Sequence, residues 1–178
     1  YQRAGEPDSG PYATLKAIRN FEQLQGQVTL DKPRCADASR AFGLTADTQT
    51  VPAAIATFAR TTGETITETL VAVPAKVAEE QVTRRVPALC RTFRAKVAGQ
   101  TSTHQVIEST PDRHQIGEGS RTVGLVTMSG TLRVTMWFVV FKARGYLGTV
   151  SVYGPAATKS QVEEFGRRAL AQAERILP

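Results

Sequence analysis

The chain has 178 residues, of which 41% are hydrophobic and 21% charged, a composition typical of one ordinary globular domain. No apolar run approaches the ~18 residues of a membrane-spanning helix, so the sequence predicts no such helix. The formal net charge of +6 suits an anionic partner. The basic residues are not interleaved with aromatic side chains, on which nucleic-acid bases would stack. We therefore expect no nucleic-acid partner and keep an anionic membrane surface open as one.

The first eleven residues are polar and rich in glycine and proline, which predicts a flexible tether over 1–11. One domain is expected to follow over 12–178, because a chain of this length can bury a core of its own. The sequence begins at Tyr1 and carries no apolar signal segment. We expect a signal peptide or lipid-anchor segment to have preceded it.

Helices are predicted by apolar residues at helical spacing in three places. In 13–24, Leu15, Ile18, Phe21 and Leu24 recur at steps of three, and a further helical turn is expected at 37–42. A helix over 75–93 is expected to kink or restart at Pro87. A closing helix begins at the capping box from Thr158 to Gln161 and continues to Leu177.

Strands are predicted by β-branched, apolar-rich runs separated by glycine-containing turns. The runs are 51–60, 64–73, 94–98, 103–109, 121–128, 131–143 and 146–153. Because consecutive strands joined by tight turns are antiparallel, one antiparallel sheet of six to seven strands is expected. The run 131–143 is apolar on both faces, which places it near the centre of that sheet. With helices before, within and after the strands, the fold class is α+β.

The two cysteines, Cys35 and Cys90, each lie beside the boundary of a predicted element. An even, minimal and widely spaced pair predicts one structural disulfide and an oxidising compartment. Such a bond would contribute on the order of 4 kcal/mol in the chain-entropy treatment. The alternative is two unrelated buried thiols in a cytosolic protein.

No motif predicts a reaction, a metal or a cofactor. The only histidines, His104 and His114, lack further ligands at the spacing that zinc requires. The loop over 117–121 lacks the residues of a phosphate loop and the helix that would follow it. Ser120, His114 and Asp112 can be assembled into a triad only on paper, since one short loop rarely supports that geometry. We therefore expect no catalytic residue.

The order of motifs is similar to that of a known family. Pro33-x-Cys35 precedes a hairpin, and a helix then leads to Leu89-Cys90-x-x-Phe93, a strand and a turn at Gly99, with a Trp-Phe-Val-Val strand and a closing helix later. This layout resembles the extracytoplasmic sensor-like domains of actinobacterial lipoproteins and of mycobacterial receptor Ser/Thr kinases. It is also similar to the PsbP-like sandwich.

The resemblance implies an antiparallel sheet flanked by helices and no catalytic residues. The receptor-kinase members carry two disulfides and this chain can form one, which favours the lipoprotein branch. The implied function is a secreted or lipid-anchored, non-enzymatic binding or sensor domain for a cell-envelope component or small amphiphile. Two alternatives remain open: an envelope-associated structural or protein-interaction module and, less favoured, a hydrolase.

We expect a ligand to lie between the sheet and either the helix at 77–93 or the closing helix. Apolar side chains of the sheet would contact its apolar part, and arginines at the rim would hold an acidic headgroup. The apolar set is Leu132, Val134 and Met136, and the basic set is Arg84, Arg85 and Arg91.

Overall fold

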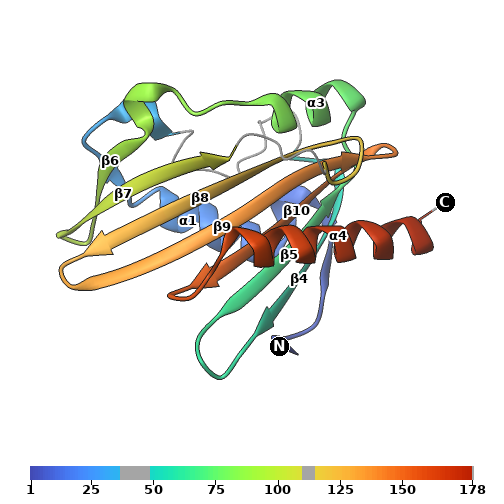
Figure 1. Cartoon of the computed structure of the whole chain (residues 1–178), viewed down its shortest axis with the longest axis horizontal. Coiled ribbons are helices and arrows are strands. Elements are labelled where there is room, and N and C mark those ends of the chain that lie inside the picture. Colours follow the sequence, from blue (N-terminus) through green and yellow to red (C-terminus); the bar gives the residue numbers. More distant parts are fainter. Residues whose placement is uncertain (37–48, 110–114, 178) are drawn as a thin grey trace.

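The computed structural model describes residues 1–36, 49–109 and 115–177. Ten strands form one antiparallel sheet in the order β1-β4-β5-β10-β9-β8-β7-β6-β3, with β2 paired to β4 (Figure 1). Within these residues, no helix is both long enough and apolar enough to cross a membrane.

The strands fall into short pieces at the sheet edges and long ones between them. The short strands are β1 (Gln2–Arg3), β2 (Asp8–Pro11) and β3 (Thr29–Leu30). The longer strands are β4 (Pro52–Ala59), β5 (Thr65–Val71), β6 (Thr92–Val97), β7 (Gln100–Ser109), β8 (Gly119–Ser129), β9 (Leu132–Ala143) and β10 (Tyr146–Gly154). The prediction that 131–143 lies near the sheet centre is confirmed, because β9 is the fifth of nine strands along the sheet order.

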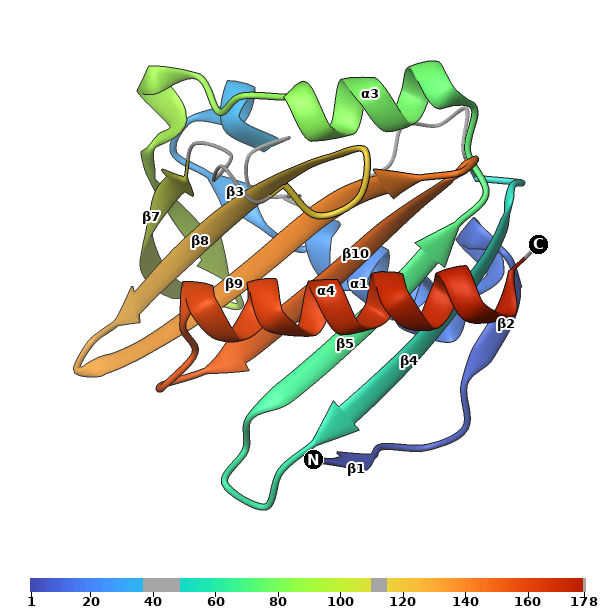
Figure 2. The ribbon, with the colours of Figure 1, turned by 45° about the vertical axis from the view of Figure 1, so that its right-hand side comes forward.

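Helices cover both faces of the sheet. The helix α4 (Lys159–Ile176) crosses β10, β9 and β8 on one face, in front of the sheet in Figure 2. On the other face lie α1 (Lys16–Gln25) and α3 (Ala75–Thr83), which share a core with Phe138 and Val140 of β9. Short 3₁₀ turns complete the chain: η1 (Tyr12–Thr14), η2 (Pro33–Cys35) and η4 (Ala88–Cys90).

The two faces of β9 belong to two separate cores. Phe138 and Val140 point toward α1 and α3, whereas Val139 and Phe141 pack under α4 with Val162. All four β9 side chains are at most 3% exposed, as the double-sided apolar pattern of this run predicts. The α+β class is confirmed, and the sheet is larger than the six to seven strands expected.

The extra strands arise where the sequence predicted a tether or no element. Residues 1–11 are not simply a flexible tether, because β1 and β2 both pair with β4. Without them, β4 would leave a row of backbone donors and acceptors unpaired at the edge. The Tyr1 ring lies edge-on to Phe165 of α4, and the Arg60 guanidinium lies 4.1 Å from the centroid of the Tyr1 ring. These two contacts anchor the start of the chain.

The predicted helix over 75–93 is too long. The helix α3 ends at Thr83, and Arg84 already has extended backbone angles (φ −52°, ψ 138°). Pro87 disfavours helical geometry in the residue before it, and the Val86 N–H donates instead to Glu108 Oε1 at 2.8 Å. After α3 the chain therefore continues through η4 into β6, which begins at Thr92. The helical turn expected at 37–42 lies outside the described residues.

Candidate functional site

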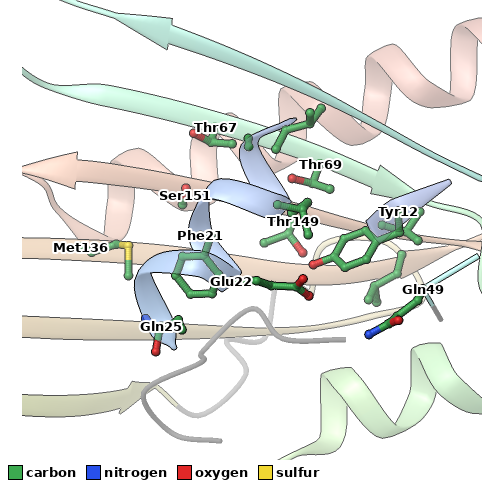
Figure 3. A pocket seen from close by; sticks show the side chains of 15 residues that line it. Tyr12, Phe21, Glu22, Gln25, Gln49, Thr67, Thr69, Met136, Thr149 and Ser151 are labelled. Atoms are coloured by element: carbon green, nitrogen blue, oxygen red, sulfur yellow. The ribbon is translucent and has the colours of Figure 1, made fainter. Parts of the chain in front are cut away.

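A cavity of about 500 Å³ lies between α1 and the sheet (Figure 3). Its floor is formed by β4, β5, β10 and β9, and its roof by α1. Met136 lies at one end, and Tyr12 and Gln49 lie at the other (Figure 3). This volume is within the range of sites that hold small molecules, which is about 300–1,000 Å³.

Four hydroxyl side chains line the floor. Thr67 and Thr69 on β5 lie directly opposite Ser151 and Thr149 on β10, so that two cross-strand pairs stand side by side. Because side chains of a strand alternate between faces, all four point toward α1. Figure 3 shows them between Met136 and Tyr12. The floor therefore carries four hydroxyl groups beside the apolar side chains of Ile55, Val71, Leu147 and Met136.

These hydroxyls are available for a ligand. The Thr67 hydroxyl lies 3.4 Å from that of Thr57, a long hydrogen bond. In the described part of the chain, the hydroxyls of Thr69, Thr149 and Ser151 make no hydrogen bond to protein. All of them are partly exposed. A hydroxyl both donates and accepts, so that each can pair with a donor or an acceptor on a ligand.

The roof is apolar and loosely packed. Ile18 and Phe21 of α1 line the cavity, yet no residue of this helix is buried. The helix is held at its start instead: Tyr12 and Leu15 are 8% and 1% exposed, and the Lys16 N–H donates to Asp8 Oδ2 at 2.7 Å. An amphipathic helix normally packs its apolar stripe onto the sheet, whereas α1 covers a hollow.

One charged side chain lines the cavity among the described residues, the carboxylate of Glu22 on α1. Lysine, arginine and histidine are absent from this described lining. The polar remainder consists of the floor hydroxyls, the Tyr12 phenol and the amides of Gln25 and Gln49. The site is thus amphiphilic: Ile18 and Phe21 line its roof, hydroxyl and apolar side chains share its floor, and Glu22 contributes one carboxylate.

The apolar residues singled out from the sequence lie on the face of β9 that is turned toward α1 and α3, and one of them lines the cavity. Met136 does so, while Val134 and Leu132 precede it along β9 on the same face, outside the lining. Leu132 is 62% exposed at the end of the β8–β9 hairpin. The predicted apolar set therefore extends from the cavity mouth toward the hairpin end.

The predicted arginines do not join this site. Arg84 and Arg85 follow α3 and lie close enough to influence the buried Arg121. Arg91 is exposed beside Cys90. None of the three is among the described residues that line the cavity, and their role in binding stays a prediction.

Arg121 is a buried charged side chain beneath α3. It is 4% exposed, and its Nε donates to the Gln81 carbonyl at 2.6 Å. Burial first, and then the positive charge of Arg84, lower the pKa of Arg121 to about 10, so that it stays charged at neutral pH. The carbonyls of the last helical turn lack partners within the helix. Arg121 thus supports the end of α3.

The disulfide predicted from the sequence is present. Cys35 in η2 and Cys90 in η4 are bonded, with Cα atoms 5.4 Å apart, and both side chains are buried. The Lys32 ammonium reinforces this link by donating to the carbonyls of Leu89 and Thr92. The bond joins two 3₁₀ turns. The sequence predicts that Cys90 lies on the helix over 75–93, but it lies in η4 instead.

Among the side chains considered for catalysis, those within the described residues make contacts that stabilise the fold. Ser120 is buried and its hydroxyl accepts from the Ile116 N–H at 3.0 Å, whereas Asp112 and His114 lie outside the described residues. His104 stacks on Phe93, with ring centroids 5.0 Å apart. Within the described ranges, no group of three or more His, Cys, Asp or Glu could hold a metal ion.

The hydroxyl floor and α1 are the parts of the site that sequence reasoning missed. A signal existed in 64–73, where Thr67 and Thr69 alternate with Ile66, Glu68 and Leu70. This alternation separates a hydroxyl face from the face that packs under α4. It was obscured because both faces carry β-branched or polar residues.

Comparisons with known proteins give fold similarity alone. No protein-family model matches the sequence, and curated proteins give no significant match. The structure is similar to the extracellular domain of PknH from Mycobacterium tuberculosis, with a TM-score of 0.55 and 12% identity over 97% of this chain and 86% of that one. The structure of an uncharacterised Mycobacterium smegmatis protein, the Rv0999 ortholog, matches with a TM-score of 0.45 and 14% identity, over 83% of this chain and 75% of that one. The predicted resemblance to a mycobacterial extracellular domain is confirmed at the level of fold.

Proposed function

We propose that this protein is an extracytoplasmic, non-enzymatic binding domain that takes a small amphiphilic ligand into the cavity beneath α1. One observation carries the proposal: Ile18 and Phe21 face the cavity, yet α1 has no buried residue. Apolar surface exposed to water costs about 25 cal/mol per Å² relative to burial. A ligand with an apolar part would remove this surface from water and complete the packing of α1.

The disulfide supports an extracytoplasmic location, because such bonds persist mainly in oxidising compartments. The fold similarity to a domain described as extracellular agrees with it. We further propose that the protein is secreted or lipid-anchored, as the sequence led us to expect.

A binding role is favoured over catalysis by the chemistry of the lining. A nucleophilic hydroxyl needs an adjacent base. In the described part of the chain, the hydroxyls of Thr69, Thr149 and Ser151 make no hydrogen bond to any base. These residues are therefore better suited to hold a ligand than to attack one.

The test uses an uncharged fluorescent amphiphile, N-phenyl-1-naphthylamine, titrated with the whole protein. Ala17 is exposed on α1 and lines the cavity. In the Ala17→Trp variant the indole would fill the cavity from a helix with no buried residue, so the fold should persist. The matched control, Asn20→Trp, places the same group elsewhere on α1, outside the lining.

We expect the unmodified protein and Asn20→Trp to enhance the fluorescence of the amphiphile with similar affinity. Ala17→Trp should weaken binding at least about tenfold, since a filled site loses most apolar contact. Circular dichroism verifies that both variants are folded. Equal binding by Ala17→Trp and Asn20→Trp, or no binding by the unmodified protein, would overturn the proposal.

A further inference from the structure

The charge of the cavity contrasts with that of the whole chain. The chain has 22 lysines and arginines against 16 acidic residues. None of the basic residues lines the described cavity, whereas the carboxylate of Glu22 does. An anionic group entering this site would lose its hydration and meet a like charge, with no cation among the described lining residues to compensate. The lining thus selects against the acidic headgroup that the sequence led us to expect.

The floor offers the opposite kind of recognition. Two cross-strand pairs, Thr67–Ser151 and Thr69–Thr149, give four hydroxyls in adjacent positions. Opposite residues in an antiparallel pair have Cβ atoms about 5 Å apart. Such a spacing suits a ligand that itself carries several neighbouring hydroxyls, because each partner can act as donor or acceptor.

From this we infer that the polar part of the ligand is an uncharged, polyhydroxylated group of the glycosyl or polyol class, bound by the hydroxyl floor. This inference rests on the proposed function and specifies its ligand. The apolar face of a sugar ring, or an attached alkyl chain, would contact Phe21 and Ile18 on the roof. The Glu22 carboxylate would accept hydrogen bonds from ligand hydroxyls at the rim.

The same chemistry can come from a free saccharide or from the headgroup of a glycolipid. The direction of the apolar residues distinguishes the two arrangements. Met136 lines one end of the cavity, and Val134 and Leu132 continue from it along β9 on the same face. An alkyl chain could follow this path, whereas a free saccharide would occupy the cavity alone.

The experiment compares amphiphiles of one alkyl length and different headgroups, below their micelle concentrations, by calorimetry. The glycosides are octyl β-glucoside and octyl β-maltoside. The comparison compounds are octyl sulfate, octyltrimethylammonium and triethylene glycol monooctyl ether. Methyl β-glucoside and maltose test the free saccharide.

We expect at least one glycoside to bind about tenfold more tightly than the sulfate, the ammonium and the glycol ether, because only it pairs with several floor hydroxyls. Binding of methyl β-glucoside or maltose with similar affinity would indicate a free saccharide. Binding of the octyl glycosides alone would indicate a glycolipid headgroup. Both outcomes support the inference.

The double variant Thr149→Val, Ser151→Ala removes two hydroxyls with little change in shape. It should reduce the glycoside affinity at least about fivefold, because ligand hydroxyls lose their partners. Because N-phenyl-1-naphthylamine carries no hydroxyl group, its affinity should fall less than that of the glycoside, so that the ratio of the two affinities changes. The control Thr103→Val makes the same change at an exposed position of β7 outside the lining and should alter neither.

Failure of this inference is distinct from failure of the proposed function. If N-phenyl-1-naphthylamine binds in the cavity and the glycosides show no preference, the ligand class is wrong and the binding function stands. Tighter binding of octyl sulfate, or unchanged glycoside affinity in the double variant, would also overturn it. If no amphiphile binds, both proposals fall.

Discussion

Two glycines in the central strands make room for aromatic rings on the face covered by α4. Gly148 lies opposite Phe141, and a Cβ at this glycine would lie 2.2 Å from Phe141 Cζ. Gly124 lies opposite Trp137 in the same way, with 2.9 Å to Trp137 Cη2. In each pair the ring of one strand occupies the space above the glycine of its neighbour. These glycines are required by close packing.

Gly148→Ala should therefore lower the free energy of unfolding by about 1–3 kcal/mol, because the buried Phe141 ring must move in a packed core. The matched control is Gly26→Ala at the end of α1, where φ is −61° and the added Cβ makes ordinary contacts. That change should be neutral or stabilise by a few tenths of a kcal/mol. Urea unfolding measures both, and an equally small effect at Gly148 would show that the ring is not held there.

His104 gives the fold a pH dependence. Its Nδ1 lies 3.0 Å from the Thr127 hydroxyl and its Nε2 2.8 Å from that of Ser102. Desolvation by burial lowers the pKa of His104 in the folded state. The unfolded chain, with a histidine pKa of about 6.5, then binds the proton more readily. Stability from this residue is present above that pH and is lost as the pH falls through it toward the lower folded pKa.

We expect the free energy of unfolding to fall between pH 7.5 and 5.5, and to fall less steeply in His104→Gln. Glutamine keeps hydrogen-bonding capacity and does not titrate. Urea unfolding curves at several pH values give both slopes. Because carboxylates titrate in both proteins, the difference between the slopes isolates His104. Identical slopes would contradict this account.

Among the elements, the disulfide joins parts of the chain that pack little apolar surface of their own. It links η2 and η4 across 55 residues of sequence, beside the pairing of the two-residue β3 with β6. Both cysteines are at most 1% exposed. Because β3 has only two residues, few backbone hydrogen bonds join it to β6. The disulfide is therefore the main constraint that holds this edge of the sheet.

The Cys35→Ala, Cys90→Ala double variant should lose on the order of 4 kcal/mol of stability, because the unfolded chain regains the entropy of a long loop. Urea unfolding measures the loss. Hydrogen exchange should show earlier opening of β6 than of β9, since the bond lies beside one and far from the other in sheet order. A loss below about 1 kcal/mol would mean that packing alone holds this edge.

Long periodic elements could be predicted from the sequence, and short ones could not. The capping box at Thr158 is formed as predicted, because its side chain and that of Gln161 satisfy each other's backbone N–H groups. The hairpin of β4 and β5 also follows its pattern. By contrast, β1 and β3 have two residues each, too few for any alternation to show. Their pairing depends on distant strands.

Across the whole molecule, the sheet separates a core that is tightly packed under α4 from a core that is packed beneath α3 and hollow beneath α1. Under α4, Val139, Phe141 and Val162 are at most 1% exposed. Beneath α1 the corresponding space is the cavity. The sequence predicted a ligand on this face and named Met136, which lines the site. It could not show that α1 is the roof, because an amphipathic stripe has the same pattern whether it packs on a sheet or on a cavity.

This asymmetry predicts unequal hydrogen exchange in the unliganded protein. The helix α1 has no buried residue, whereas α4 buries Val162, Gly166 and Ala173. Local opening requires less free energy where few apolar contacts are broken. Amides of α1 should therefore exchange far faster than those of α4. Mass spectrometry of peptides from the two helices measures this, and equal rates would contradict the view of α1 as a loosely held roof.

A bound ligand should then act mainly on α1. At a free concentration of ~100 Kd it stabilises the folded state by about 2.7 kcal/mol, and exchange that requires α1 to open should slow accordingly. Exchange in α4 through its own local openings should not change, since the sheet lies between α4 and the cavity. In Ala17→Trp the same ligand concentration should give clearly less protection. Protection of α4 alone would place the binding site on the other face of the sheet.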